Sequence, residues 1–298
     1  MEKVRETVLS RGWTGQRQPC ACVIGLGLIG GSWAGALARQ GWVVSAVECN
    51  EESLNEAKAR GWVKEGWQEI PETLDVDLII LATPISLLTE SLARIVRCVP
   101  PGVLISDVGS VKKTICQVTD DLDSIYFIGG HPMTGSEQHG FQAANPSLFE
   151  GYPYVLTPPS SCPQDVVDRF SELIQSFGAR IVFREAEDHD HGVALISHVP
   201  HILSLALALA ASEGDSKGKP LELAGRSFRE ITRLVDSSPQ MWREILFSNS
   251  SAILSSLDIW ERKLQEIRGI IERSDGEEII EVFERAQKAR ARVLDGRN

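Results

Sequence analysis

The sequence lacks the features that mark membrane-spanning, secreted and nucleic-acid-binding proteins. Its longest apolar stretch, residues 202–211, is too short to cross a membrane, because a spanning helix needs about 18 or more apolar residues. Residues 1–18 contain basic side chains but no apolar segment, so we expect an N-terminal extension rather than a secretory signal. Acidic residues outnumber basic ones by 41 to 30, which gives a formal net charge of −11. Because nucleic-acid binding needs a basic surface, we expect no nucleic-acid partner. Because no apolar stretch is long enough to span a bilayer, we expect no membrane partner either.

The sequence lacks the cysteine patterns that bind metals or build disulfide frameworks. None of the 6 cysteines belongs to a C-x-x-C pair, and residues 163–298 contain none. This distribution favours reduced thiols in a cytoplasmic protein. The remaining composition, 43% hydrophobic and 24% charged, is ordinary for a globular protein. At about 100–200 residues per domain, the length of 298 predicts one large domain or two ordinary ones.

The first half of the chain alternates short apolar runs with helical segments. Such runs, rich in β-branched residues and spaced by 10–20 residues, are typical of βαβ units and a parallel sheet. The predicted strands are 20–24, 42–47, 78–82, 103–106, 125–128, 152–157 and 180–183. A helix is predicted over 163–177, between the last two strands.

The second half, from residue 185 onward, has few glycines and is rich in Ala, Leu and Ser. It is predicted to be all-helical, with 194–211 forming a long, mostly buried helix. The other predicted helices are 221–236, 239–273 and 277–294. We therefore expect an N-terminal extension (1–18), an α/β domain (19–184) and a helical domain (185–298).

A glycine-rich sequence follows the first predicted strand and opens a helix. It matches G-x-G-x-x-G with Gly25, Leu26, Gly27, Leu28, Ile29 and Gly30. In this context the pattern predicts a Rossmann-type dinucleotide site, where small residues allow a tight turn and close approach of the backbone to a pyrophosphate. The helix N-terminus would add attraction for the phosphate charge. The alternative is a glycine turn that binds nothing.

Two further residues are placed to contact a dinucleotide. Glu48 ends the second predicted strand, where a carboxylate can accept hydrogen bonds from both ribose hydroxyls. It would also repel a 2′-phosphate, so NAD is favoured and NADP is left possible. Thr83 follows the third predicted strand and would lie against the cofactor. The alternatives are a surface role for Glu48 and a simple end to the strand at Thr83.

Chemistry is most strongly indicated at His131, which stands between Gly130 and Pro132 just after a predicted strand. Ligands of doubly wound sheets bind at the carboxyl ends of strands, so this histidine is well placed for proton transfer. A loop histidine that only caps the strand is the alternative. Ser110 follows the preceding strand and could either cap the next helix or reach a ligand.

The other histidines and arginines allow weaker inferences. His198 and His201 stand three residues apart, but acidic co-ligands are not evident, so we expect no metal and favour packing at a domain interface. Arg229 and Arg233 are expected on one helix face, where an arginine could bind a carboxylate in a bidentate manner. From the spacing alone, an ordinary surface ladder of Arg229 and Arg233 with Glu230 is favoured over carboxylate binding.

With these motifs in place, the chain resembles the prephenate/arogenate dehydrogenase family of tyrosine biosynthesis. The motifs that carry the resemblance are GLGLIGGS at 25–32, ATP at 82–84, DVGSVK at 107–112, GGHPMTGSE at 129–137, EDHD at 187–190, ISHVPH at 196–201 and ITR…MW at 231–242. The resemblance implies a Rossmann domain followed by a helical domain that forms a homodimer. It also implies oxidative decarboxylation of a cyclohexadienyl acid, prephenate or arogenate, with hydride transfer to a nicotinamide cofactor.

The resemblance also implies roles for individual residues. His131 resembles the catalytic histidine that bonds the ring 4-hydroxyl, and Ser110 resembles its partner in orienting that hydroxyl. Arg233 resembles the arginine that binds the side-chain carboxylate. The positions that match residues lining or gating the substrate pocket are Glu137, His189, His201 and Trp242.

Two other functions are compatible with the sequence. One is a two-domain dehydrogenase of the β-hydroxyacid or ketopantoate type, which uses a catalytic lysine in its helical domain. Beyond residue 185 this chain has lysines only at 217, 219, 263 and 288, the first two in a predicted loop. The other is a non-enzymatic protein that senses NAD, for which the set of His131, Ser110 and Arg233 would be unexplained.

Overall fold

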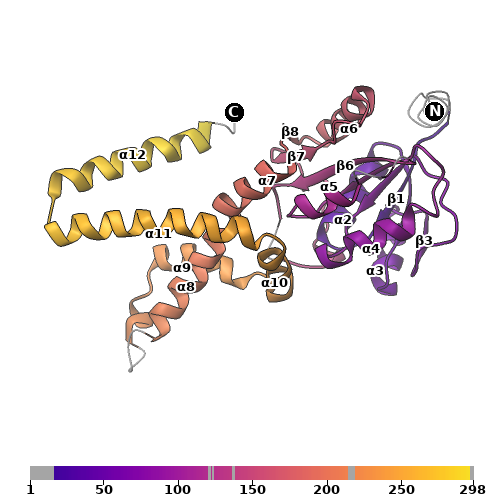
Figure 1. The fold of residues 1–298 in the computed structure, drawn as a ribbon. Coiled ribbons are helices and arrows are strands. Elements are labelled where there is room, and N and C mark those ends of the chain that lie inside the picture. The colour runs from indigo at the N-terminus through magenta and orange to yellow at the C-terminus, as the bar shows by residue number, and fades with distance from the viewer. Residues whose placement is uncertain (1–16, 120–121, 123, 136–137, 214–218, 296–298) are drawn as a thin grey trace.

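The structure is a computed structural model that describes residues 17–119, 122, 124–135, 138–213 and 219–295. The described chain has two parts, a sheet covered by helices and a set of helices beside it (Figure 1). The strand β8 ends at Phe183 and the helix α7 begins at Ala186, so the change of architecture falls where the composition changes. Most of the expected N-terminal extension lies outside the described residues.

The sheet has eight strands in the order β3-β2-β1-β4-β5-β6-β7-β8. The strands are β1 Cys20–Ile24, β2 Val43–Val47, β3 Glu65–Trp67, β4 Leu78–Leu81, β5 Leu104–Asp107, β6 Tyr126–Pro132, β7 Pro153–Thr157 and β8 Arg180–Phe183. All neighbouring strands are parallel except β6 and β7. The expected α/β fold with a Rossmann-type, mainly parallel sheet is confirmed, although the sheet is not parallel throughout. The short edge strand β3 was not predicted, because three residues around Gly66 give no recognisable pattern.

The strand β6 is longer than predicted and changes partner along its length. Its first half pairs in parallel with β5, and its second half pairs antiparallel with β7, where His131 lies opposite Val155. The prediction that His131 follows the strand is therefore wrong, because it lies within β6. Glycine weakens strand propensity, so Gly129 and Gly130 mimic a strand end. Here they are required by close packing: a Cβ on Gly130 would lie 2.5 Å from the carbonyl oxygen of Asp107.

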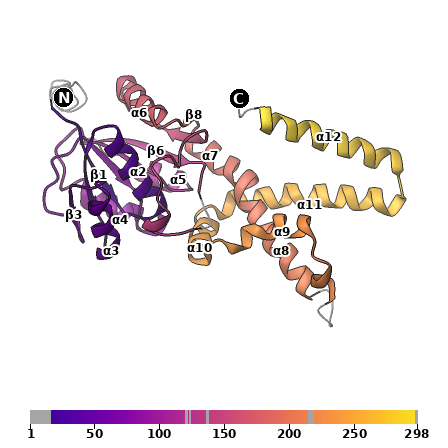
Figure 2. The same cartoon turned by 180° about the vertical axis from the view of Figure 1, so that it is seen from behind.

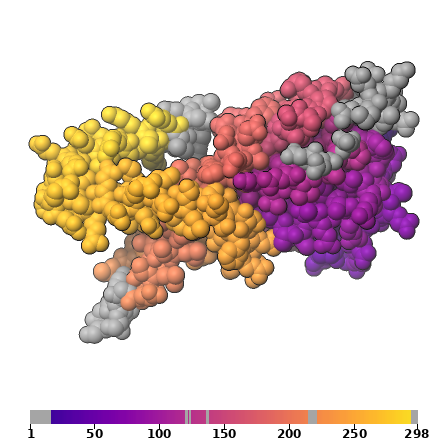
Figure 3. All heavy atoms as spheres, viewed as in Figure 1, coloured from indigo at the N-terminus to yellow at the C-terminus, as the bar shows by residue number. Residues whose placement is uncertain are grey.

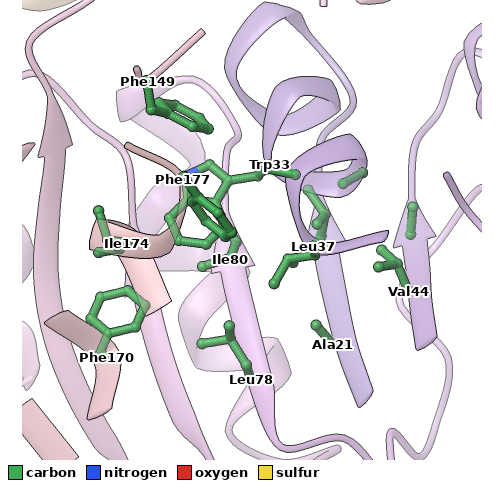
Figure 4. Packing of buried hydrophobic residues seen from close by; sticks show 14 of the residues in the cluster. Ala21, Trp33, Leu37, Val44, Leu78, Ile80, Phe149, Phe170, Ile174 and Phe177 are labelled. Carbon is green, nitrogen blue, oxygen red and sulfur yellow. The ribbon is translucent and has the colours of Figure 1, made fainter. Parts of the chain in front are cut away.

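Helices cover both faces of the sheet. They are α2 Leu28–Arg39, α3 Glu51–Ala59, α4 Ile85–Ile95, α5 Lys113–Thr119 and α6 Gln164–Ser176. Alternate residues of the strands enter opposite cores, because strand side chains point alternately to the two faces. Ile80 belongs to one core and Ile79 to the other. The first core is built around Trp33, whose ring lies 5.1 Å from that of Phe177 and is fully buried (Figure 4).

The helical part contains more breaks than the sequence predicted. Its elements are α7 Ala186–Val193, the π-helix η2 Ala194–His198, α8 Val199–Glu213, η3 Lys219–Leu223, α9 Arg226–Thr232, η4 Arg233–Asp236, α10 Pro239–Ser248, α11 Ser250–Arg273 and α12 Gly276–Asp295. The predictions of single helices over 221–236 and 239–273 are therefore wrong. The second is interrupted at Asn249, whose side chain is used in the site described below. Figures 1 and 2 show α11 and α12 as an antiparallel pair that projects away from the sheet.

The expectation that the 194–211 helix is mostly buried is wrong for the described chain. Leu195, Ile196, Leu205 and Leu209 are exposed, and the helical part forms an open arm beside the compact sheet part (Figure 3). The continuous helical segment Ala186–Glu213 has a mean hydropathy of 1.9 over its most apolar window, of which 28% is buried. By length and composition alone it could cross a membrane, but apolar helices in the cores of globular proteins share this length and composition, so one such helix does not indicate a membrane protein.

Candidate active site

The glycine loop between β1 and α2 has the shape of a phosphate cradle. Gly25 adopts a φ of +94°, and a Cβ there would lie 2.7 Å from the carbonyl oxygen of Ala82. A Cβ on Gly27, by contrast, would meet nothing within 4 Å, so this side of the loop is open to a ligand. Gly27 is also the N-cap of α2 and makes no side-chain cap, which leaves the first N–H groups of the helix available to an anion.

The carboxylate of Glu48 is held against this loop. Its Oε2 accepts the N–H of Leu26 at 2.7 Å, and its Oε1 accepts the N–H of Asn50 at 2.8 Å. Oε1 also accepts from Sγ of Cys49 at 3.3 Å, whereas one donor is found for Oε2 among the described residues. Because a carboxylate oxygen can accept more than one hydrogen bond, Oε2 keeps capacity for a ribose hydroxyl. Glu48 is thus oriented toward the glycine loop rather than away from it.

Thr83 supplies an unsatisfied polar atom at the same edge of the sheet. Its Oγ1 is buried and has no hydrogen-bond partner in the described chain, and its backbone N lies 3.2 Å from the position of a Cβ on Gly25. Buried hydroxyls normally find a partner, so this atom points to a ligand that is absent from the protein alone. The open cradle, Glu48 and Thr83 together fit a bound dinucleotide.

His131 forms a hydrogen-bonded chain with the helical part. Its Nδ1 lies 2.8 Å from Nε2 of His189, and Nδ1 of His189 lies 2.7 Å from Oδ1 of Asp190. All three residues are at most 9% exposed. Burial lowers the pKa of His131 well below its usual range, and His189, Lys112 and His198 lower it further. His131 is therefore neutral near pH 7 and able to accept a proton.

A buried ion pair fixes the backbone beside His131. The Nζ of Lys112 donates to Oδ2 of Asp107 and, at 2.8 Å, to the carbonyl oxygen of Gly130. The other oxygen of Asp107 accepts the N–H of Gly130 at 3.1 Å. Both charged side chains are fully buried, and their mutual pairing with these hydrogen bonds is what makes such burial tolerable. The pair joins the end of β5 to β6 one residue before His131.

The turn that contains Ser110 leads into α5, but another residue caps this helix. The carboxylate of Asp190 accepts the N–H of Lys112 at 2.7 Å and the N–H of Lys113 at 2.9 Å. The possibility that Ser110 caps α5 is therefore wrong, and its partly exposed side chain is left available for a ligand. Asp190 lies in α7, so the cap comes from the helical part.

The helical part adds a second group of polar and aromatic side chains. Asn249, at the break between α10 and α11, donates from Nδ2 to the carbonyl oxygen of Asp190 at 2.8 Å and to Nδ1 of His198 at 3.2 Å. The rings of His201 and Trp242 stack with centroids 3.7 Å apart. The Nε1 of Trp242 is buried and unpartnered in the described chain, so it is a donor awaiting an acceptor. His198 is the last residue of the π-helix η2, and π-helical segments are frequent at functional sites.

The two parts of the chain are also joined at the N-terminus of α4. Glu244 of α10 accepts from the hydroxyl of Ser86 at 2.9 Å and from the N–H of Ser86 at 3.3 Å. Because α4 starts directly after Thr83 and Pro84, this contact places the helical part against the predicted cofactor edge.

Arg233 lies at the start of η4, whereas Arg229 lies in α9. The prediction that they share one continuous helix is wrong, yet both line the same open cavity of about 560 Å³. Glu230 pairs with Arg226 at 2.6 Å. The residues that line this cavity do not include His131. Glu137 lies outside the described residues.

Several site residues escaped the sequence analysis. Lys112 and Asp190 stood within the quoted motifs, but nothing in the sequence indicated their contacts, and Asn249 carried no signal at all. The structure brings His131 into contact with His189, and His201 into contact with Trp242. Within the described residues no cluster of three or more His, Cys, Asp or Glu could hold a metal ion.

Comparison with known proteins gives one consistent family. The nucleotide-binding domain of prephenate dehydrogenase matches residues 33–183, and its dimerization domain matches residues 185–285. The prephenate dehydrogenase of Bacillus subtilis is 34% identical over 285 residues, 92% of this chain and 76% of that protein. The cyclohexadienyl dehydrogenase of Zymomonas mobilis is 31% identical over 274 residues, 90% of this chain and 94% of that protein.

Solved structures agree with this result. Synechocystis arogenate dehydrogenase is 31% identical, with a TM-score of 0.81 over 92% of this chain and 99% of that one. Prephenate dehydrogenase from A. aeolicus, in complex with hydroxyphenyl propionate and NAD+, is 25% identical, with a TM-score of 0.86 over 93% and 99%. This chain belongs to the prephenate dehydrogenase family.

Proposed function

We propose that this protein catalyses the oxidative decarboxylation of prephenate to 4-hydroxyphenylpyruvate, or of arogenate to tyrosine, with transfer of a hydride to NAD. The observation that carries the proposal is the buried, neutral imidazole of His131 at the sheet edge that also holds the glycine cradle. In doubly wound sheets this edge is where ligands bind. The reaction needs a hydride acceptor and a base at one place, and this edge provides for both.

NAD supplies the hydride acceptor when it is bound. The residues that would hold it are Gly25, Leu26, Gly27, Leu28, Ile29, Gly30, Glu48 and Thr83. The carboxylate of Glu48 favours free ribose hydroxyls over a 2′-phosphate, so we assign NAD rather than NADP.

His131 handles the proton of the ring 4-hydroxyl. As hydride leaves C4, that carbon becomes carbonyl-like and the hydroxyl proton becomes acidic, so neutral His131 accepts it. Loss of the ring carboxylate as CO₂ leaves its bonding electrons in the ring and produces a phenolate. His131 then returns the proton to the phenolate oxygen, so the base is regenerated. A positioned base of this kind contributes about 10²–10⁴-fold to a rate.

The remaining contacts of the substrate come from both parts of the chain. Ser110 orients the 4-hydroxyl beside His131, and Arg233 binds the side-chain carboxylate. The other residues proposed to line the pocket are Glu137, His201 and Trp242, with His189 behind His131. The two proposed domains, 19–184 and 185–298, would thus close around the substrate. We place the enzyme in the cytoplasm.

A homodimer completes the helical part. Large apolar side chains such as Leu209, Leu254 and Ile271 are at least half exposed on α8 and α11. Several large apolar side chains exposed on neighbouring helices are typical of an interface, and the matching family domain is a dimerization domain. Light scattering at micromolar concentration should give twice the monomer mass of 32.7 kDa. A stable monomer would refute the homodimer.

The function is tested by following NADH release with purified protein, first with prephenate and then with arogenate. We expect turnover with at least one of them and loss of at least about a hundredfold in kcat for His131→Asn with NAD binding retained. Absence of NADH release with both substrates would refute the proposal.

A further inference from the structure

We propose that Asp190 is the positioning residue that decides which nitrogen of His131 is the base, and that it acts through His189. The inference rests on the proposed function for its catalytic meaning. The geometry itself is independent of the substrate, because it concerns only the contacts of Asp190 with His189 and of His189 with His131.

Asp190 carries a negative charge. Although burial opposes it, hydrogen bonds from His189 and from the N–H groups of Lys112 and Lys113 lower the pKa of this carboxyl. Asp190 is therefore ionised near pH 7. An ionised carboxylate can only accept hydrogen bonds.

The charge of Asp190 fixes where the hydrogens lie on the rings of His189 and His131. Because Asp190 can only accept, Nδ1 of His189 must carry a hydrogen across their 2.7 Å contact. In a neutral imidazole the other nitrogen is then bare, so Nε2 of His189 accepts. Its partner at 2.8 Å, Nδ1 of His131, must be the donor. This leaves Nε2 of His131 as its only basic atom.

The surrounding charged and titratable groups do not compete for these nitrogens. Lys112 is paired with Asp107 and with a backbone carbonyl of β6. Burial lowers the pKa of His198 to about 4, so its ring is neutral and accepts from Asn249 rather than from His189 or His131. Cys116 faces Thr157, and burial raises the pKa of its thiol to about 11, so it stays uncharged.

Without the carboxylate of Asp190, the positions of these hydrogens would no longer be fixed. The ring of His189 would then be free to carry its hydrogen on Nε2, which would point at Nδ1 of His131. His131 would have to place its own hydrogen on Nε2, the position that must be bare to accept a proton. The carboxylate also stabilises the cation that His131 becomes, through the intervening ring.

The main test compares Asp190→Asn with the control Glu187→Gln. Glu187 lies one turn earlier in α7, and its side chain is 66% exposed and pairs with Lys113. The contact of Glu187 with His191 is made by the backbone carbonyl, so this substitution does not remove it. We expect Asp190→Asn to lower kcat about ten- to a hundredfold, the usual loss when a partner that orients a functional histidine is removed, with little change in KM. Glu187→Gln should have the same kcat and KM as the unaltered enzyme.

A spectroscopic readout separates positioning from general damage. Nitrogen-15 NMR of histidine-labelled full-length protein distinguishes protonated from bare ring nitrogens. We expect a protonated Nδ1 and a bare Nε2 for His131 in the unaltered protein and in Glu187→Gln, and the reversed or mixed pattern in Asp190→Asn. This measurement needs no substrate, so it holds even if neither prephenate nor arogenate is turned over.

A second pair of variants covers the case in which loss of the α5 cap prevents Asp190→Asn from folding. His189→Gln and His189→Leu both keep the contacts of Asp190 with Lys112 and Lys113. The glutamine carbonyl can still accept from Nδ1 of His131, whereas leucine cannot. We expect the leucine variant to lose kcat about tenfold or more and the glutamine variant to recover part of that loss. A bare Nδ1 on His131 in the unaltered protein, or an unchanged kcat in His189→Leu, would overturn the proposal.

Discussion

His198 makes the stability of this protein depend on pH in a way that can be calculated. Its ring is 1% exposed and accepts from Asn249 at 3.2 Å. Burial lowers its pKa to about 4; the carboxylate of Asp190 opposes this shift, and His189 and His201 add to it. In an unfolded chain the same ring titrates at about 6.5.

The sign follows from which state binds the proton. Between pH 6.5 and about 4 the unfolded chain is protonated at His198 and the folded protein is not, so acid favours unfolding. The contribution of neutral His198 to the free energy of unfolding is present above about pH 6.5, and it is lost as the pH falls toward the pKa of the folded protein, about 4. At about 1.4 kcal/mol per pKa unit, the loss between pH 7.5 and pH 5 is about 2 kcal/mol.

The perturbation is His198→Asn, which keeps an acceptor near the position of Nδ1 but has no titratable ring. The variant is expected to be less stable at every pH, because it loses the ring that packs 5.8 Å from Trp242. Its free energy of unfolding should nevertheless fall by about 2 kcal/mol less than that of the unaltered protein between pH 7.5 and pH 5. Urea denaturation at one protein concentration measures both values.

A matched control is His191→Asn, in the same helical segment but with an exposed ring. It should lose as much stability on acidification as the unaltered protein. If His198→Asn loses as much as this control, His198 is protonated in the folded protein and the assignment of a buried neutral ring is wrong.

The other predictions concern activity. Burial lowers the pKa of His131 well below its usual range, so kcat should be flat above about pH 6.5 and fall only in more acidic solution; a rise of kcat between pH 7 and 8 would contradict this. Arg233→Ala should raise KM about ten- to a hundredfold through loss of a charged hydrogen bond, and an unchanged KM would leave Arg233 without a substrate role. For the unaltered enzyme kcat/KM should be higher with NAD than with NADP, and Glu48→Ser should narrow the difference; a preference for NADP would exclude the ribose contact.

The sheet was predictable because its strands are short, continuous and apolar. All of β4 is buried, as expected for a central parallel strand with helices on both faces. The second half of β6 was not predictable, because Gly129 and Gly130 resemble a turn until the close approach of β5 and β7 is known. Local propensity cannot report a packing requirement set by residues distant in sequence.

The candidate site was predictable as a set of residue types, but its connections were not. His131 stood out through its neighbours in sequence, whereas its partner His189 is 58 residues away. The break at Asn249 had no signal either, because Asn249 lies in an otherwise regular helical pattern and is stabilised by its contact with Asp190. Helix ends that are fixed by tertiary hydrogen bonds cannot be read from periodicity alone.

The helix α11 begins directly after Asn249 and has 24 residues, so it is a rod about 36 Å long. One end touches the backbone of Asp190, and the other lies in the projecting arm with α12 (Figure 1). When a rigid helix of this length tilts, even by a small angle, both of its ends are displaced. The helix α11 therefore connects the outer surface of the arm to the hydrogen bond between Asn249 and Asp190, and the position of one constrains the position of the other.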